Sequence, residues 1–302
     1  MDLPLLLAAS NPVEHIIDRP LPGGLTMNIV TMVVVAALLV ITMWKAADAI
    51  ETGPESAGNE RYITKGIFSQ MVEVMVLALR DHVVRPQLGH DTSRFLPYVL
   101  TLFFFILYNN LFGLVPLLDI QHLFGIHTTW VGGTATGNIA VTAALAVIAF
   151  FVIHVNAIAK VGLGGWAKHF TAGAPWYIWF IMIPVEIMGM FIKPAALAIR
   201  LFANMTAGHT LLATMMMFTG MSFAALKYLG GIPITLVAIA ASVPIMFLEL
   251  FVAFLQAFIF MFLTVVFIAQ FLHHEHEEHA MAESYDDPDR SAEEDRAAPV
   301  MA

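Results

Sequence analysis

Residues 232–272 read IPITLVAIAASVPIMFLELFVAFLQAFIFMFLTVVFIAQFL, an almost uninterrupted apolar sequence. Glu249 is its only charged side chain. As a straight helix the stretch would be about 60 Å long, roughly twice the thickness of the hydrocarbon core of a bilayer. Pro244 offers a place to bend. The stretch therefore predicts a membrane helix that is strongly tilted, bent, or both.

A second long apolar stretch precedes the first one, and we expect a helix over 176–228 followed by a helix over 232–272. Gly230-Gly231 just before Pro233 predicts a turn that joins the two helices into a hairpin. Lipid normally resists a steep tilt, so we expect this hairpin to lie against a large protein partner.

Three shorter apolar runs lie upstream and predict membrane helices at about 25–45, 95–118 and 138–159, each long enough to cross a bilayer. A further helix is expected over 61–85. Its apolar residues recur at four-residue spacing between charged ones, a pattern typical of a helix that lies in the membrane interface.

The composition agrees with this architecture. The chain is 59% hydrophobic and 12% charged with a mean hydropathy of +0.79, which leaves too little polar surface for a soluble domain of 302 residues. Nothing in the charge pattern indicates nucleic acid. We expect an all-α polytopic membrane protein of about five membrane-embedded helices and one interfacial amphipathic helix, with the last two helices long, strongly tilted and paired as a hairpin.

Charge also predicts how the chain is oriented. Six basic residues fall between Lys45 and Arg94, whereas Asp119 to Asn138 carries none, so the first connection is expected in the cytoplasm and the N-terminal segment 1–24 in the periplasm. Ten of the 23 acidic residues lie between Glu275 and Asp295. We expect 273–302 to be a disordered acidic cytoplasmic tail, because it cannot bury enough apolar surface to order itself.

Arg200 lies inside an apolar helix, where an arginine costs about 2.5–3.5 kcal/mol and cannot lose its proton. One interpretation is that it reaches the headgroups or pairs statically with Glu249. The functional interpretation is that it faces a mobile carboxylate along an ion route. On an ideal helix Asn204 lies on the same face as Arg200, whereas His209 points the opposite way. This separation suits a barrier with a proton path behind it.

The predicted turn sets side by side those residues whose numbers sum to about 461. Glu249 then lies within a turn of His209, and Gln256 lies about a turn from Arg200. A histidine and a carboxylate at one membrane depth are the usual parts of a proton relay, because both can titrate near neutral pH. The alternative is a static buried pair of the histidine and the carboxylate.

Two segments of this hairpin resemble the signature segments of the a subunit of F-type ATP synthase. They are Arg200-Leu-Phe-Ala-Asn204-Met-Thr-Ala-Gly208-His209, and Glu249 with Leu255-Gln256-Ala-Phe-Ile-Phe-Met261. The resemblance runs from about Leu25 to Leu272 and takes in further segments upstream: Tyr108-Asn109-Asn110-Leu-Phe-Gly-Leu-Val-Pro116, Asn138-Ile-Ala-Val-Thr142, Pro184-Val-Glu186 and Lys193-Pro194.

The resemblance implies a stator that faces a ring of c subunits and assembles with peripheral-stalk b subunits and the rest of the complex, in the inner membrane of a bacterium. Arg200 would separate two aqueous half-channels, with Asn204 and Gln256 beside it. His209 and Glu249 would line the periplasmic half-channel, with weaker candidates beside them and on the cytoplasmic side. The weaker periplasmic candidates are Asn110, Asn138 and His154, and the cytoplasmic ones are Glu186 and Lys193.

One departure from the family pattern concerns His209 and Glu249. Many bacterial members carry an acid where this chain has His209 and a histidine where it has Glu249. The exchange resembles mitochondrial members and keeps one residue of each kind, so the relay is still expected. No covalent chemistry, cofactor or metal is implied for the chain, which contains no cysteine.

Several alternatives stay open at this point. A sodium-translocating homologue differs mainly in ion ligands on another subunit. A free-standing secondary transporter would use Arg200 and Glu249 to bind its substrate. An intramembrane metalloenzyme would need more histidine and carboxylate ligands in motif spacing. The histidines at 273, 274, 276 and 279 could bind a metal, but they do not fit H-E-x-x-H and suit a solvated terminus.

Overall fold

The structure is a computed structural model that describes residues 26–52, 62–64, 66–115, 117, 132, 135–171 and 175–286. Only the backbone is described at 51–52, 62–63, 168–169, 216, 220, 223–231 and 272–286. The predicted periplasmic segment 1–24 and the end of the predicted tail, 287–302, lie outside the described residues.

Nearly all of the described chain is helical. Helix α2 is followed by two short antiparallel strands, β1 and β2, in which Ile50 lies opposite Thr64. The elements in order are α2 (Met27–Asp48), β1 (Ile50–Thr52), β2 (Tyr62–Thr64), α3 (Ile67–Leu79), the π-helix η3 (Arg80–Val84), α4 (Arg85–Leu88), η4 (Gly89–Asp91), α5 (Thr92–Gly113), η5 (Ala135–Gly137), α7 (Ile139–His169) and α8 (Trp179–Asp286).

Five helical stretches within the described residues are long and apolar enough to cross a membrane: Met27–Asp48, Ile67–Gly113, Ile139–Ala167, Trp179–Thr219 and Ile232–Phe271. The expected all-helical membrane fold is therefore confirmed, with β1 and β2 as a small addition. We call Trp179–Thr219 the first limb of α8 and Ile232–Phe271 its second limb.

Several element boundaries differ from the sequence prediction; the helix expected over 95–118, for example, spans Thr92–Gly113. The helix expected from residue 61 begins at Ile67, because Tyr62–Thr64 pairs with β1 instead. Helix α7 continues past 159 to His169 across a kink at Gly162. The backbone of 273–286, predicted to be disordered, is helical as the end of α8. An existing helix propagates easily through residues such as Glu, Ala and Met, which accounts for this last difference.

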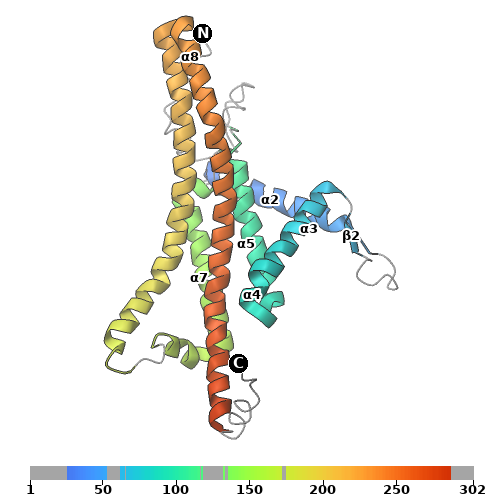
Figure 1. The fold of residues 1–302 in the computed structure, drawn as a ribbon, viewed down its shortest axis with the longest axis vertical. Coiled ribbons are helices and arrows are strands. Elements are labelled where there is room, and N and C mark those ends of the chain that lie inside the picture. The colour runs from blue at the N-terminus through green and yellow to red at the C-terminus, as the bar shows by residue number, and fades with distance from the viewer. Residues whose placement is uncertain are drawn as a thin grey trace, which may run out of the picture.

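The two limbs of α8 run in opposite directions and lie side by side toward the ends that join, whereas the start of the first limb diverges from the second limb, as Figure 1 shows in yellow and orange-red. The side chains of Asn204 and Gln256 meet between them, and their residue numbers sum to 460. This contact agrees with the predicted register of about 461. It places the reversal near residue 230, where Gly230-Gly231 predicted a turn.

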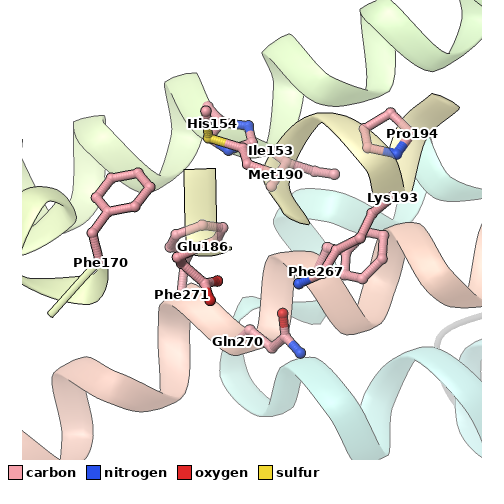
Figure 2. Close-up of a pocket in the computed structure, with 10 residues that line it drawn as sticks. All are labelled: Ile153, His154, Phe170, Glu186, Met190, Lys193, Pro194, Phe267, Gln270 and Phe271. Atoms are coloured by element: carbon pink, nitrogen blue, oxygen red, sulfur yellow. The ribbon is translucent and has the colours of Figure 1, made fainter. Parts of the chain in front are cut away.

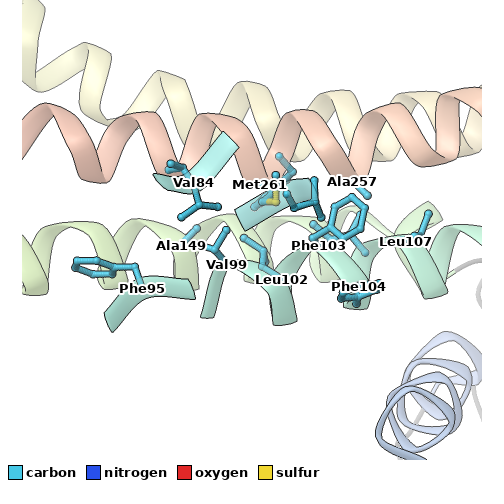
Figure 3. Packing of buried hydrophobic residues seen from close by; sticks show 14 of the residues in the cluster. Val84, Phe95, Val99, Leu102, Phe103, Phe104, Leu107, Ala149, Ala257 and Met261 are labelled. Carbon is cyan, nitrogen blue, oxygen red and sulfur yellow. The ribbon is translucent and has the colours of Figure 1, made fainter. Parts of the chain in front are cut away.

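The hydrophobic core lies where α8 packs against α5 and α7 (Figure 3). Phe103 of α5 and Met261 of the second limb are fully buried there. Ala149 and Ala257 line the same contact, and small residues such as these let membrane helices approach closely. The core therefore fixes the second limb against α5 and α7.

Helix α2 has a different direction from this bundle. It crosses the long axis of α5 and α8 steeply in Figure 1, and Figure 3 shows it end-on while those helices run across the view. Its 22 residues span about 33 Å, which matches a bilayer core when the helix is upright. Val40 and Trp44 are more than 60% exposed on its outer side, as expected for a lipid-facing surface.

Candidate functional site

Arg200 lies on an exposed face of the first limb of α8. Its neighbours on this face, Ile199 and Ala203, are also exposed, so the cation stands in an apolar surface. The structure assigns Arg200 no ion pair or hydrogen bond with any described residue. The static pairing of Arg200 with Glu249, which the sequence left open, is absent from this part of the chain.

Asn204 and Gln256 form the polar contact nearest to Arg200 along the hairpin. The Asn204 Nδ2 donates to the Gln256 Oε1 at 3.2 Å. Gln256 is only 1% exposed, and its Nε2 has no hydrogen-bond partner. A buried donor without a partner is costly, so an acceptor brought within reach of this amide would be stabilised.

Glu249 is buried in the same hairpin, about two turns from Gln256 along the second limb. It is 4% exposed, and neither carboxylate oxygen has a hydrogen-bond partner. Its carboxylate lies against the backbone of Gly208, where a Cβ atom would overlap it. Because His209 follows Gly208 directly, the structure brings the predicted relay pair to the same level of the hairpin.

Gly208 lies in the first signature segment, but the sequence alone predicts no role for it. Glycine inside a helix costs about 1 kcal/mol relative to alanine, so an interior glycine signals a packing reason. Here the reason is the space taken by the Glu249 carboxylate. The signal was present in the sequence, but the neighbour that fills the space could be identified only from the folded hairpin.

A second polar cluster lies in a pocket between α7 and both limbs of α8, shown in Figure 2. Its polar lining consists of His154, Glu186, Lys193 and Gln270, and the remainder is aromatic or aliphatic. The Lys193 Nζ lies 5.2 Å from the centre of the Phe267 ring, within the range of a cation–π contact.

The pocket changes the grouping of the candidates. His154 lies with Glu186 and Lys193, although it was predicted to lie with His209 and Glu249. Gln270 had not been singled out at all. It lies fourteen residues after Gln256 on the stripe that begins at Glu249, so the seven-residue spacing could have indicated it.

The two asparagine candidates make hydrogen bonds to the backbone, one between elements and one at a helix start. The Asn110 Nδ2 donates to the Ala253 carbonyl at 3.2 Å, and its Oδ1 accepts from Thr136 at 2.9 Å. Asn110 thus ties α5 and η5 to the second limb. The Asn138 Oδ1 accepts from the Ala140 N–H at 2.9 Å at the start of α7. Neither asparagine belongs to the pocket of Figure 2.

The profile of the family described as ATP synthase A chain matches residues 25–269, which is most of the chain and includes both polar clusters except Gln270. The chain belongs to the ATP synthase A chain family. The described residues contain no group of three or more histidine, cysteine or acidic side chains placed to hold a metal ion.

Curated relatives of the ATP synthase A chain family agree with this assignment. ATP synthase subunit a 2 of Chlorobaculum tepidum is 41% identical over 79% of this chain and 61% of its own length. ATP synthase subunit a of Chloroherpeton thalassium is 39% identical over 83% of this chain and 68% of its own length. ATP synthase subunit a of Myxococcus xanthus is 36% identical over 91% of this chain and 82% of its own length. The chain thus spans less than two thirds of the first of these relatives.

Proposed function

We propose that the chain is the stator subunit of a rotary ATP synthase, which couples proton translocation to the rotation of a ring of c subunits. The observation that carries the proposal is Arg200, a cation without a partner among the described residues on an exposed apolar face. Such a cation is expensive in a membrane unless a carboxylate from another subunit meets it. Family membership and the names of the relatives support this assignment.

In the proposed mechanism a proton enters from the periplasmic side through His209 and Glu249. It neutralises a carboxylate on the c ring, which then leaves Arg200 and rotates into lipid. After nearly a full turn the carboxylate meets the cytoplasmic path, with Glu186 and Lys193, and releases its proton. Arg200 blocks the direct route, because a fixed cation repels a proton and attracts only the ionised carboxylate.

The energetics favour a rotary device over a single transport step. Each charge that crosses the membrane yields about 2.3 kcal/mol per 100 mV. Several crossings must therefore be summed before ATP synthesis becomes favourable. Peripheral-stalk b subunits would keep this chain stationary in the bacterial inner membrane, with its N-terminus in the periplasm.

Reconstitution separates this proposal from a free-standing transporter. The complete membrane sector, with its c ring, should conduct protons in lipid vesicles under an imposed potential. The purified chain alone should conduct nothing, because the mobile carboxylate belongs to the ring. Replacing sodium by choline in the buffer should leave the flux unchanged. Flux by the isolated chain supports a secondary transporter, and flux that depends on sodium supports a sodium-driven rotor.

The proposal also fixes how the hairpin lies in the membrane. If α2 stands near the membrane normal, its steep crossing with α8 in Figure 1 places both limbs far from that normal. Each limb is about 40 residues long and would exceed the bilayer core if upright. We expect large tilts for both limbs in an electron microscopy map of the assembled membrane sector. Tilts of both limbs below about 30° would contradict this expectation.

A further inference from the structure

The pocket of Figure 2 contains a titratable ring that the mechanism above does not use. We infer that His154 exchanges protons in this pocket and is a third proton-transfer group beside Glu186 and Lys193. The inference rests on the proposed function, because it supplies a residue of the proton path on the pocket side of Arg200.

The hydrogen bonding of His154 fixes which ring nitrogen can take a proton. Its Nδ1 lies 2.8 Å from the Phe150 carbonyl oxygen. A carbonyl can only accept, so Nδ1 carries the hydrogen and the neutral ring has its lone pair on Nε2. The Nε2 atom is buried and has no hydrogen-bond partner. The ring therefore presents an unused acceptor in a pocket that also contains a carboxylate.

Aromatic side chains hold the ring in this position. The His154 ring lies 4.2 Å from the centre of the Phe150 ring and 5.6 Å from that of Phe271. Trp166 packs edge-on at 6.3 Å and contacts Phe170, which lines the pocket. A ring packed on several sides keeps one orientation, as a proton-transfer group requires.

The kink at Gly162 places Trp166 beside His154. Gly162 adopts φ 76° and ψ 167°, a conformation that glycine accepts without a steric penalty. The segment that follows carries Trp166 and Phe170 back toward the pocket. The Trp166 Nε1 is also buried without a partner, so the two neighbouring rings offer one hydrogen-bond donor and one acceptor.

The charges around the ring suit a group that gains and loses a proton. Glu186 and Lys193 face the pocket from the first limb, and the neutral Gln270 faces it from the second. Elsewhere on α7, Lys160 pairs with Asp91 at 2.5 Å, and neither residue lines the pocket. The carboxylate of Glu186 and the ammonium of Lys193 share the pocket with the His154 ring. The carboxylate can compensate the charge of the protonated ring, and it can pair with the ammonium when the ring is neutral.

The experiment compares His154→Gln with His154→Glu in the assembled membrane sector. The two side chains have nearly the same size, but only glutamate can exchange a proton. We expect His154→Gln to slow passive proton flux about tenfold. The dependence of this flux on pH should change on the pocket side of the membrane and stay the same on the other side. His154→Glu should restore at least half of the flux with a displaced pH midpoint. Co-purification with the c ring checks that each variant assembles.

His82→Gln is the matched control, because the Nδ1 of His82 makes the same local contact with a backbone oxygen, at 3.2 Å from Ala78, outside the pocket. It should behave as the unmodified protein. Equal flux and equal pH profiles for His154→Gln and His154→Glu overturn the inference, and so does the failure of both to assemble, since the ring would then be structural. Arg200→Ala in the same vesicles tests the proposed function separately.

Discussion

Membrane vesicles with Arg200→Ala are expected to leak protons in both directions and to make no ATP. Arg200 is the only barrier in the proposed mechanism between two paths that both reach the ring carboxylate. Without the cation, a protonated carboxylate passes directly from one path to the other, and the gradient dissipates. We expect passive flux to rise at least about tenfold and coupled synthesis to fall below about 1% of its normal rate.

Arg200→Lys should also abolish coupling, although it keeps a positive charge. A lysine presents a compact and strongly hydrated ammonium, and it can give up its proton where arginine cannot. It also lacks the planar fork that binds a carboxylate through two hydrogen bonds. The measurement is proton flux, with and without the catalytic head, in vesicles under an imposed potential.

Arg80→Ala serves as the control for a lost arginine. Arg80 lies in η3 and pairs at 2.8 Å with the adjacent Asp81 on the exposed surface, outside both polar clusters. An exposed pair of this kind contributes little, so coupling should persist. Proton-tight Arg200→Ala vesicles together with full coupling in Arg200→Lys would mean that Arg200 has a structural role, and the mechanism would have to be abandoned.

The hairpin and its register could be predicted from the sequence because both follow from local signals. Two apolar stretches joined by Gly230-Gly231 and Pro233 can pair in only a narrow range of registers. The contact of Asn204 with Gln256 falls within one residue of the predicted sum. Polar residues inside an apolar helix are also few, so their positions alone indicated the candidates on α8.

The pocket could not be predicted in the same way, because it depends on how separate helices pack. His154 is the only titratable residue in its apolar run, and no periodicity connects α7 with either limb of α8. Its place beside Glu186 follows from the packing of α7 on the hairpin and from the kink at Gly162. The steep crossing of α2 over the bundle is likewise a tertiary property, absent from any single helix pattern.

His209→Ala and Glu249→Ala are expected to slow proton-driven ATP synthesis about tenfold or more while the complex still assembles. The carboxylate of Glu249 is buried without a hydrogen-bond partner beside Gly208, and His209 follows in the chain. Removing either group leaves a gap in the path that water bridges less well. The double variant should be little worse than the slower single variant, because both act in one relay. The measurement is the synthesis rate at a fixed imposed gradient.

Gly208→Ala tests the same relay without removing a titratable group. The added methyl occupies the place of the Glu249 carboxylate and must displace it, since a Cβ at residue 208 overlaps that side chain. We expect synthesis to slow several-fold because a proton relay depends on the separation of its two groups. Gly189→Ala is the matched control, since a Cβ there approaches only the flexible Lys193 side chain, at 3.9 Å. Normal synthesis by Gly208→Ala and by the double variant of His209 and Glu249 would exclude the relay and leave the buried carboxylate a structural role.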